Sequence, residues 1–247
     1  MTTICITGAS SGIGKAFAEL LAEKENHLII TARRKNLLEE LKKEVTKKGC
    51  TVTIIVADLT KKNHVDALAE KLISLNVDVL INNAGFGEYT AFAESKTSED
   101  MLAVNVTALT TLSRKILPSL IKKNTGGILN VSSVAGFMPG PKMAVYFATK
   151  SYVISFTEAL AEELKNTQLK VSCLCPGATE SEFFKVAHTK NLGKGNLPSA
   201  LDVASYGWKA FSKNKTIAVY GIMNKLAVIT IRLLPRKIVR KITSKVL

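Results

Sequence analysis

The chain has 247 residues, of which 47% are hydrophobic and 22% are charged. This composition excludes a disordered or low-complexity chain, because it provides enough apolar surface for a packed core. The 34 Lys and Arg residues outnumber the 20 Asp and Glu residues, which gives a net charge of +14. Four scattered cysteines are too few for a disulfide framework, so we expect reduced thiols and a cytoplasmic location.

The amino-terminal residues Met1-Thr2-Thr3 lead directly into an apolar run, so we expect no secretory signal. The most apolar late stretch, Thr216–Ile231, is interrupted by Lys225 and is too short for a spanning helix. The sequence therefore predicts a protein that is soluble or bound to a membrane surface.

Short β-branched runs alternate with longer amphipathic stretches. The predicted strands are Thr3–Thr7, His27–Ala32, Thr51–Ala57, Val77–Asn82, Gly127–Ser132, Lys170–Cys175 and Thr216–Tyr220. The predicted helices are Gly14–Lys24, Asn36–Lys48, Lys61–Leu75, Ser98–Lys123, Ala144–Lys165 and Ser199–Lys213. This alternation predicts an α/β fold, namely a doubly wound, Rossmann-type parallel sheet of about seven strands with helices on both faces.

No linker rich in Pro, Gly or Ser and no internal repeat divides the chain. We therefore expect one domain over residues 1–221, followed by a basic extension over residues 222–247. In a doubly wound sheet the ligand binds beyond the carboxyl ends of the strands. The residues that follow each strand are thus the candidates for function.

A glycine-rich loop follows the first predicted strand and precedes a predicted helix. Its glycines are spaced by four and then two residues, and the members that we expect to bind a dinucleotide are Gly8, Ser10, Ser11, Gly12, Ile13 and Gly14. Glycine permits close backbone approach, and a helix N-terminus offers free N–H groups to a pyrophosphate. The alternative is a plain strand-to-helix turn.

The same loop also matches the G-x-S-x-G nucleophile elbow of hydrolases. A hydrolase needs a late histidine, and His188 is the only one, in a polar loop without an orienting motif. The elbow also normally follows an interior strand rather than the first. The dinucleotide interpretation is therefore favoured.

Two arginines, Arg33 and Arg34, follow the second predicted strand, where an acidic residue would select a free ribose 2′-hydroxyl. A guanidinium instead suits a 2′-phosphate through paired, charge-assisted hydrogen bonds. We therefore predict NADP(H) as the cofactor, with Arg33 as the main phosphate ligand. The alternative is a solvated basic turn.

Two further strand ends are candidates for the cofactor site. Asp58 and Leu59 follow the third strand, where a carboxylate could accept a hydrogen bond from an adenine amino group. Asn82, Ala84 and Gly85 end the fourth strand, and small residues there allow the backbone to approach a ribose. Either signal alone is weak.

A possible catalytic set comes from the middle of the chain. Tyr146 and Lys150 are four residues apart, so they share one face of a predicted helix, and a nearby ammonium lowers the pKa of a phenol. Ser133 ends the fifth strand, where its hydroxyl could hold a substrate oxygen. Asn105 is a polar residue between two valines inside a predicted helix. An isolated Tyr/Lys pair is usually helix surface, but all these features together favour catalysis.

Together, the motifs from Thr3 to about Tyr220 resemble those of the short-chain dehydrogenase/reductase family in its short, single-domain form. The resemblance implies hydride transfer between NADP(H) and a carbonyl or secondary alcohol, with Tyr146 as proton donor or acceptor. It also implies that Lys150 binds the nicotinamide ribose, Ser133 polarises the carbonyl, and Asn105 holds a water in a proton relay.

The segment after the sixth predicted strand resembles the family's Pro-Gly segment that faces the nicotinamide amide. The residues that this resemblance adds to the cofactor site are Pro176, Gly177, Thr179 and Ser181. The family usually has Thr at the place of Ser181 and an aliphatic residue at that of Thr179. Because serine keeps the hydroxyl, we expect binding to be retained.

The next segment, Ser181–Leu197, is predicted to form a lid over the substrate, with glycines as hinges. Phe183 and Phe184 in the lid, with Phe86 and Tyr89 elsewhere, favour an apolar ketone or a 3-oxoacyl group over a sugar. The alternative is that these aromatic side chains only pack the loops.

One alternative class of function stays open, namely a non-catalytic protein of the same fold that binds a dinucleotide or a membrane. Nucleic acid binding would fit the charge but lacks a recognition motif, and the C-x-C spacing of Cys173 and Cys175 does not indicate a metal site.

Members of the family commonly form dimers or tetramers, so we expect a homo-oligomer.

The excess positive charge lies in the C-terminal part of the chain. No acidic residue follows Asp202, whereas ten basic residues lie between Lys209 and Lys245. The stretch Arg236–Leu247 predicts an amphipathic helix with Ile238, Val239, Ile242 and Val246 in one stripe. Such a helix indicates peripheral contact with an anionic membrane. The alternative is packing of the stripe on the domain or on another subunit.

Overall fold

The computed structural model describes residues 1–183, 187 and 196–246. These residues form a seven-stranded parallel sheet in the order β3-β2-β1-β4-β5-β6-β7. The strands are β1 (Thr2–Thr7), β2 (Asn26–Ala32), β3 (Thr51–Val56), β4 (Val79–Asn82), β5 (Gly127–Val131), β6 (Lys170–Cys175) and β7 (Ile217–Val219). The predicted strands and their parallel, doubly wound arrangement are confirmed.

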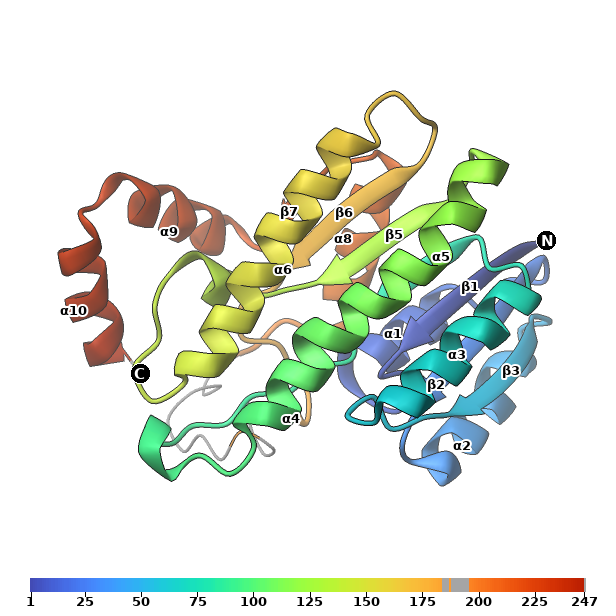
Figure 1. Cartoon of the computed structure of the whole chain (residues 1–247), viewed down its shortest axis with the longest axis horizontal. Coiled ribbons are helices and arrows are strands. Elements are labelled where there is room, and N and C mark those ends of the chain that lie inside the picture. The colour runs from blue at the N-terminus through green and yellow to red at the C-terminus, as the bar shows by residue number, and fades with distance from the viewer. Residues whose placement is uncertain (184–186, 188–195, 247) are drawn as a thin grey trace.

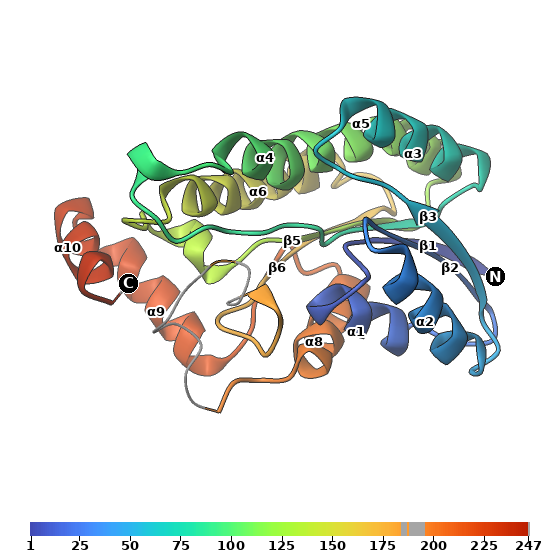
Figure 2. The ribbon, with the colours of Figure 1, turned by 90° about the horizontal axis from the view of Figure 1, so that it is seen from below.

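Helices cover both faces of the sheet (Figures 1 and 2). One layer contains α1 (Gly12–Leu20), α2 (Lys35–Thr46) and α8 (Ala200–Ser212). The opposite layer contains α3 (Lys62–Ser74), α4 (Ser98–Leu102), α5 (Leu109–Lys123) and α6 (Ala144–Glu163). Short 3-10 turns lie at η1 (Phe92–Glu94) and η3 (Val134–Phe137).

Each face of the sheet has its own hydrophobic core. Phe17 of α1 and Val203 of α8 are fully buried on one face, and Leu72 of α3 and Leu112 of α5 are fully buried on the other. Strands buried on both sides explain the nearly continuous apolar runs in the sequence. The order of the strands reverses between β1 and β4, and the carboxyl ends of the strands meet there.

The helix predicted over Ser98–Lys123 contains a wider segment. Between α4 and α5 the backbone forms a π-helical segment, η2 (Ala103–Ala108), which includes Asn105. Such segments occur frequently at functional sites. Helical periodicity alone could not distinguish this segment from a regular α-helix.

The C-terminal residues form two further helices, α9 (Ile222–Leu233) and α10 (Arg236–Val246), which project from one edge of the molecule (Figure 1). The predicted amphipathic helix after Pro235 is therefore present. None of the helices among the described residues has the length and apolar character needed to cross a membrane. All four cysteines are buried free thiols.

Candidate active site

A pocket of about 510 Å³ lies where the strand order reverses. Its wall combines the loops that follow β1, β2, β3, β4, β5 and β6 with one face of α6. The predicted site residues on this wall are Gly8, Ser10, Ser11, Gly12, Ile13, Arg33, Arg34, Asp58, Leu59, Ala84, Gly85, Ser133, Tyr146, Lys150, Pro176, Gly177, Thr179 and Ser181. Loops distant in sequence thus meet at one site, as the sequence predicts.

The glycine loop joins β1 to α1, with Ser11 directly before the helix. Gly14 was expected in the cofactor pocket but is not on its wall. A Cβ at this position would lie 2.3 Å from the Gly8 carbonyl oxygen and 2.4 Å from the Asn83 amide nitrogen. Gly14 is therefore needed for close packing of the helix against the loop.

Arg34 is held across the glycine loop. Its Nη2 donates hydrogen bonds to the hydroxyls of Ser10 and Ser11, at 3.2 and 3.0 Å, and to Glu182 Oε2 at 2.8 Å. Arg33 is exposed and also lines the pocket. The two guanidinium groups thus give this end of the pocket a positive wall.

Asp58 lies beside these arginines. Its carboxylate accepts hydrogen bonds from the amide and the hydroxyl of Thr60. Burial alone would raise the pKa of Asp58, but these hydrogen bonds and the charge of Arg33 together lower it. The group is therefore a fixed, ionised acceptor at the pocket wall.

Asn82 is not on the pocket wall, contrary to the sequence expectation. Its side chain points into the protein, where Nδ2 donates to Ser113 Oγ at 3.0 Å and to Asn130 Oδ1 at 2.9 Å. Asn83, which the sequence analysis did not select, lines the pocket and donates to the Thr7 carbonyl at 2.9 Å. Successive side chains along a strand point in opposite directions, so moving by one residue changes a side chain that points into the protein for one that points into the pocket.

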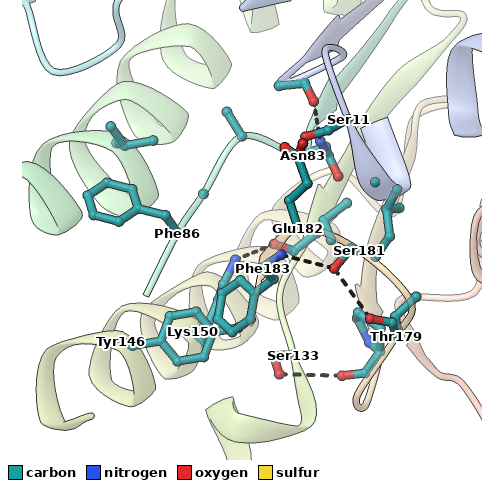
Figure 3. Close-up of a pocket in the computed structure, with 18 of the residues that line it drawn as sticks. Ser11, Asn83, Phe86, Ser133, Tyr146, Lys150, Thr179, Ser181, Glu182 and Phe183 are labelled. Atoms are coloured by element: carbon teal, nitrogen blue, oxygen red, sulfur yellow. Dashed lines mark hydrogen bonds between the residues drawn. The ribbon is translucent and has the colours of Figure 1, made fainter. Parts of the chain in front are cut away.

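Tyr146 and Lys150 project from one face of α6 into the pocket, with Ser133 nearby (Figure 3). Both are nearly buried, at 8% and 5% exposure. The Lys150 ammonium donates to the Val131 carbonyl at 2.9 Å and lies 5.8 Å from the centre of the Tyr146 ring. The predicted pair therefore shares one face, anchored to the end of β5.

Burial governs the pKa of both groups. It raises the pKa of Tyr146 to about 12, against a hydrogen bond with Ser133 that lowers it. It lowers the pKa of Lys150 to about 8, against the nearby Cys173 and Cys175, which raise it. The net shift of Tyr146 is opposite to the one expected from its spacing to Lys150, because desolvation of the phenolate outweighs the other influences on the phenol.

Ser133 directly precedes η3. Its hydroxyl accepts from the amide of Ala135 at 3.1 Å and donates to the carbonyl of Pro176 at 3.3 Å. The first bond orients the side chain, and the second joins the loop after β5 to the loop after β6. The hydroxyl thus lies between the phenol of Tyr146 and the Pro-Gly segment (Figure 3).

Asn105 is buried beneath the pocket rather than on its wall. Its Nδ2 donates to the Phe86 carbonyl at 2.9 Å and to Thr149 Oγ1 at 3.1 Å, and its Oδ1 accepts from the Phe86 amide. Thr149 in turn donates to the Tyr146 carbonyl at 2.7 Å. The side chain thus connects the loop after β4 with α6.

The loop after β6 is shaped by hydrogen bonds among its own residues. Thr179 Oγ1 donates to the Gly177 carbonyl, and Ser181 Oγ donates to the Thr179 carbonyl while accepting from the Phe183 amide. Most of the predicted lid, residues 184–186 and 188–195, lies outside the described residues, as does His188. The described part nevertheless brings Ser181, Glu182 and Phe183 to the pocket wall.

One end of the pocket is apolar. The Phe183 ring lies 5.1 Å, centre to centre, from that of Tyr146, and Phe86, Met143 and Phe147 line the same region. Sequence reasoning selected Phe86 and Phe183 but missed Met143 and Phe147, which lie one helical turn or less from Tyr146. Proximity to that tyrosine could have identified them.

Comparison with known proteins identifies relatives. A family model described as short chain dehydrogenase matches residues 2–191. The chain is 37% identical over 188 residues to an NADP-dependent 3-hydroxy acid dehydrogenase of Schizosaccharomyces pombe, covering 73% of each protein. It is 30% identical over 188 residues to a very-long-chain 3-oxoacyl-CoA reductase of Bos taurus. That match covers 73% of this chain but only 60% of the bovine protein.

Solved structures with the same architecture hold either nicotinamide cofactor. A short-chain dehydrogenase from Sphingobium yanoikuyae in complex with NADPH has a TM-score of 0.85 at 28% identity, with 93% of this chain and 92% of that one covered. An enzyme from Burkholderia phymatum in complex with NAD has a TM-score of 0.82 at 27% identity, with 94% and 92% covered. Similarity alone therefore does not select between the two cofactors.

Proposed function

Because the chain belongs to the short-chain dehydrogenase family of oxidoreductases, we propose that it is an NADP(H)-dependent enzyme that interconverts an apolar carbonyl compound and its secondary alcohol. The observation that carries the proposal is the meeting of Ser133, Tyr146 and Lys150 in one pocket with the glycine loop and its arginines. Polar side chains that could transfer a proton thus line the same cavity as a surface that could bind phosphate groups.

The pocket wall fits a dinucleotide. The N-terminus of α1 offers free N–H groups for a pyrophosphate, and Asp58 supplies an acceptor for an adenine amino group. At Gly85, an added Cβ would lie 3.0 Å from Asn105 Oδ1 and 3.3 Å from Lys150 Nζ. The absence of a side chain there lets a ribose approach the backbone beside Lys150. A bound nicotinamide would supply or accept the hydride.

NADP(H) is the proposed cofactor because the positive wall is placed for a 2′-phosphate. Arg34 donates to two loop hydroxyls and to the Glu182 carboxylate, so its guanidinium is held at the pocket wall beside the glycine loop. Arg33 is exposed beside it, and Ala32 leaves room on the wall. The Schizosaccharomyces pombe relative is named as NADP-dependent, which supports the same choice.

In carbonyl reduction, the Tyr146 hydroxyl donates the proton to the substrate oxygen. A pKa of about 12 keeps this phenol protonated at neutral pH, as a proton donor requires. Ser133 Oγ exchanges its bond to the Pro176 carbonyl for one to the substrate oxygen. Lys150 Nζ, held by the Val131 carbonyl, binds the ribose hydroxyls and favours the phenolate left after transfer.

Asn105 acts as a positioning residue in this proposal. The resemblance implies that it holds a water, but its side-chain amide is engaged by Phe86 and Thr149. Through these two partners it fixes the loop beside Gly85 and the turn of α6 that carries Tyr146. Its loss would misplace the phenol without removing any proton-transfer group.

The substrate is proposed to be an apolar ketone or a 3-oxoacyl compound. Four apolar side chains on the pocket wall, Phe86, Met143, Phe147 and Phe183, pack in the same apolar cluster as Tyr146. A sugar would leave its hydroxyls without partners against this wall. The bovine relative named as a very-long-chain 3-oxoacyl-CoA reductase agrees with an apolar acyl group.

The test is a fluorescence titration of the protein with NADPH and with NADH, followed by assays of NADPH consumption with apolar and polar carbonyl compounds. We expect tighter binding of NADPH, and loss of that preference in Arg33→Ala and Arg34→Ala. A protein that binds neither nucleotide would overturn the proposal. Tight binding without consumption of any carbonyl would favour the non-catalytic alternative.

A further inference from the structure

The C-terminal arm, defined as α9 and α10 over residues 222–246, lies outside the layered domain. Figures 1 and 2 show it projecting from one edge of the molecule, with α10 farther from the sheet than α9. No part of the arm lines the pocket. The arm therefore needs an explanation separate from the chemistry of the site.

One face of α9 is fixed to the domain. Val228 is buried against a cluster that includes Val153 and Val219, and Asn224 Nδ2 donates to the Tyr220 carbonyl at 2.8 Å. The Arg232 guanidinium lies 5.4 Å from the centre of the Phe137 ring in η3. These contacts give the arm a defined orientation, so its opposite face is a defined surface.

That opposite face is apolar. Four residues at spacings of four, three and four form one stripe along α9, and all are more than half exposed: Ile222 74%, Leu226 53%, Ile229 57% and Leu233 81%. Single exposed apolar residues are ordinary, but a row on one helix face marks an interaction site. The stripe lies on the face opposite to Val228, and the residues that the structure describes leave it exposed.

The second helix adds an apolar edge and a high positive charge. Val239 and Thr243 are buried, whereas Ile238 and Ile242 of the predicted stripe remain 44% and 48% exposed. The fold of the chain therefore buries only part of that stripe. The arm has no acidic residue, and its basic residues are Lys225, Arg232, Arg236, Lys237, Arg240, Lys241 and Lys245.

We propose that the C-terminal arm binds the surface of a lipid bilayer that contains anionic headgroups. The exposed apolar stripe would enter the boundary between headgroups and acyl chains, while the lysines and arginines contact lipid phosphates. A second copy of the chain fits less well, because two arms in contact would bring together surfaces of the same charge. The proposal does not depend on the proposed reductase activity.

The arm also begins against the wall of the pocket. A Cβ on Gly177, a pocket residue, would lie 2.5 Å from Asn224 Nδ2 in the first turn of α9. Membrane binding would therefore hold the pocket close to the bilayer. If the proposed function is correct, an apolar substrate could reach the site from the lipid phase.

The test is co-sedimentation of the full chain with vesicles of phosphatidylcholine, with and without phosphatidylglycerol, in the absence of nucleotide and substrate. We expect binding that requires phosphatidylglycerol and weakens with added salt. The triple variant Lys237→Glu, Arg240→Glu, Lys241→Glu should lose at least tenfold in binding. The triple variant Leu226→Ser, Ile229→Ser, Leu233→Ser should lose binding even at low salt.

The matched control reverses three exposed lysines in the last turns of α2 and directly after it, Lys42→Glu, Lys43→Glu and Lys47→Glu, with the same change in net charge. It should bind vesicles like the wild type. An equal loss in the control would assign binding to net charge and overturn the role of the arm. Absence of vesicle binding, together with a dimer that the serine variant dissociates in gel filtration, would assign the surface to a second copy instead.

Discussion

The layered domain and the C-terminal arm use the same kinds of side chain in opposite ways. In the domain, Leu80 is fully buried and the ammonium of Lys150 is almost removed from water. In the arm, Leu233 is 81% exposed and Lys237 lies in solvent. Burial shifts the pKa of Lys150, whereas exposure leaves the apolar area of the arm available to a partner. We therefore expect the domain to catalyse the proposed reaction and the arm to attach the protein to a membrane.

The largest effect should follow the removal of one oxygen atom from the buried site. Tyr146→Phe deletes the proposed proton donor without changing the packing of the ring, so we expect kcat to fall about a thousandfold. NADPH affinity should stay unchanged in fluorescence titration. Tyr152→Phe is the control on the same helix, because Tyr152 is 38% exposed and its hydroxyl is hydrogen-bonded to Thr110, away from the pocket. Similar activity in both variants would contradict the proposed mechanism.

Lys150→Met tests whether the buried charge of Lys150 lowers the free energy of unfolding. We expect kcat/KM to fall about a hundredfold, because the ribose and phenolate partner is lost. At pH 7 the variant should be more stable by about 2 kcal/mol, since the ammonium no longer has to be desolvated. Urea unfolding measures this difference. A variant that is less stable than the wild type at pH 7 would contradict it.

The pH dependence of stability in the wild type and in Lys150→Met tests whether the buried ammonium causes this difference. The pKa of Lys150 is lowered to about 8 in the folded protein, from 10.5 in the unfolded chain. The unfolded state therefore binds more protons between these values, and this lysine makes the wild type more stable as the pH rises through that window. The stability advantage of Lys150→Met should shrink between pH 8 and pH 10. An advantage independent of pH would mean that the ammonium is not the cause.

The domain was largely predictable from sequence, and the arm only in part. Parallel strands buried on both faces leave continuous apolar runs, and the motifs after them converge because strand ends converge. That Asn83 rather than Asn82 lines the pocket was not predictable, because it depends on the direction of each side chain at the end of β4. The π-helical segment at Asn105 and the desolvation of Tyr146 depend on tertiary packing, which periodicity does not contain. For α10, the sequence predicted the amphipathic helix but not that Ile238 and Ile242 remain half-exposed.

A smaller effect is expected at the rim of the pocket. Glu182 forms an ion pair with Arg34 at 2.8 Å, so a 2′-phosphate would compete with this carboxylate for the guanidinium. Both side chains are partly exposed, which limits the strength of the pair. Glu182→Gln should tighten NADPH binding about threefold and leave NADH unchanged. Equal changes for both nucleotides would show that the residue acts on the loop rather than on phosphate recognition.

The smallest effect should come from the exposed face of α9, and a substitution on its buried face provides the comparison. Val228→Ala removes two buried methyl groups and should lower the free energy of unfolding by about 2 kcal/mol. Leu233→Ser alters a side chain that is 81% exposed and should change it by less than about 0.5 kcal/mol. Urea unfolding in the absence of lipid measures both. A large loss for Leu233→Ser would mean that the stripe is already covered, by another part of the chain or by a second copy, and is not free to bind a membrane.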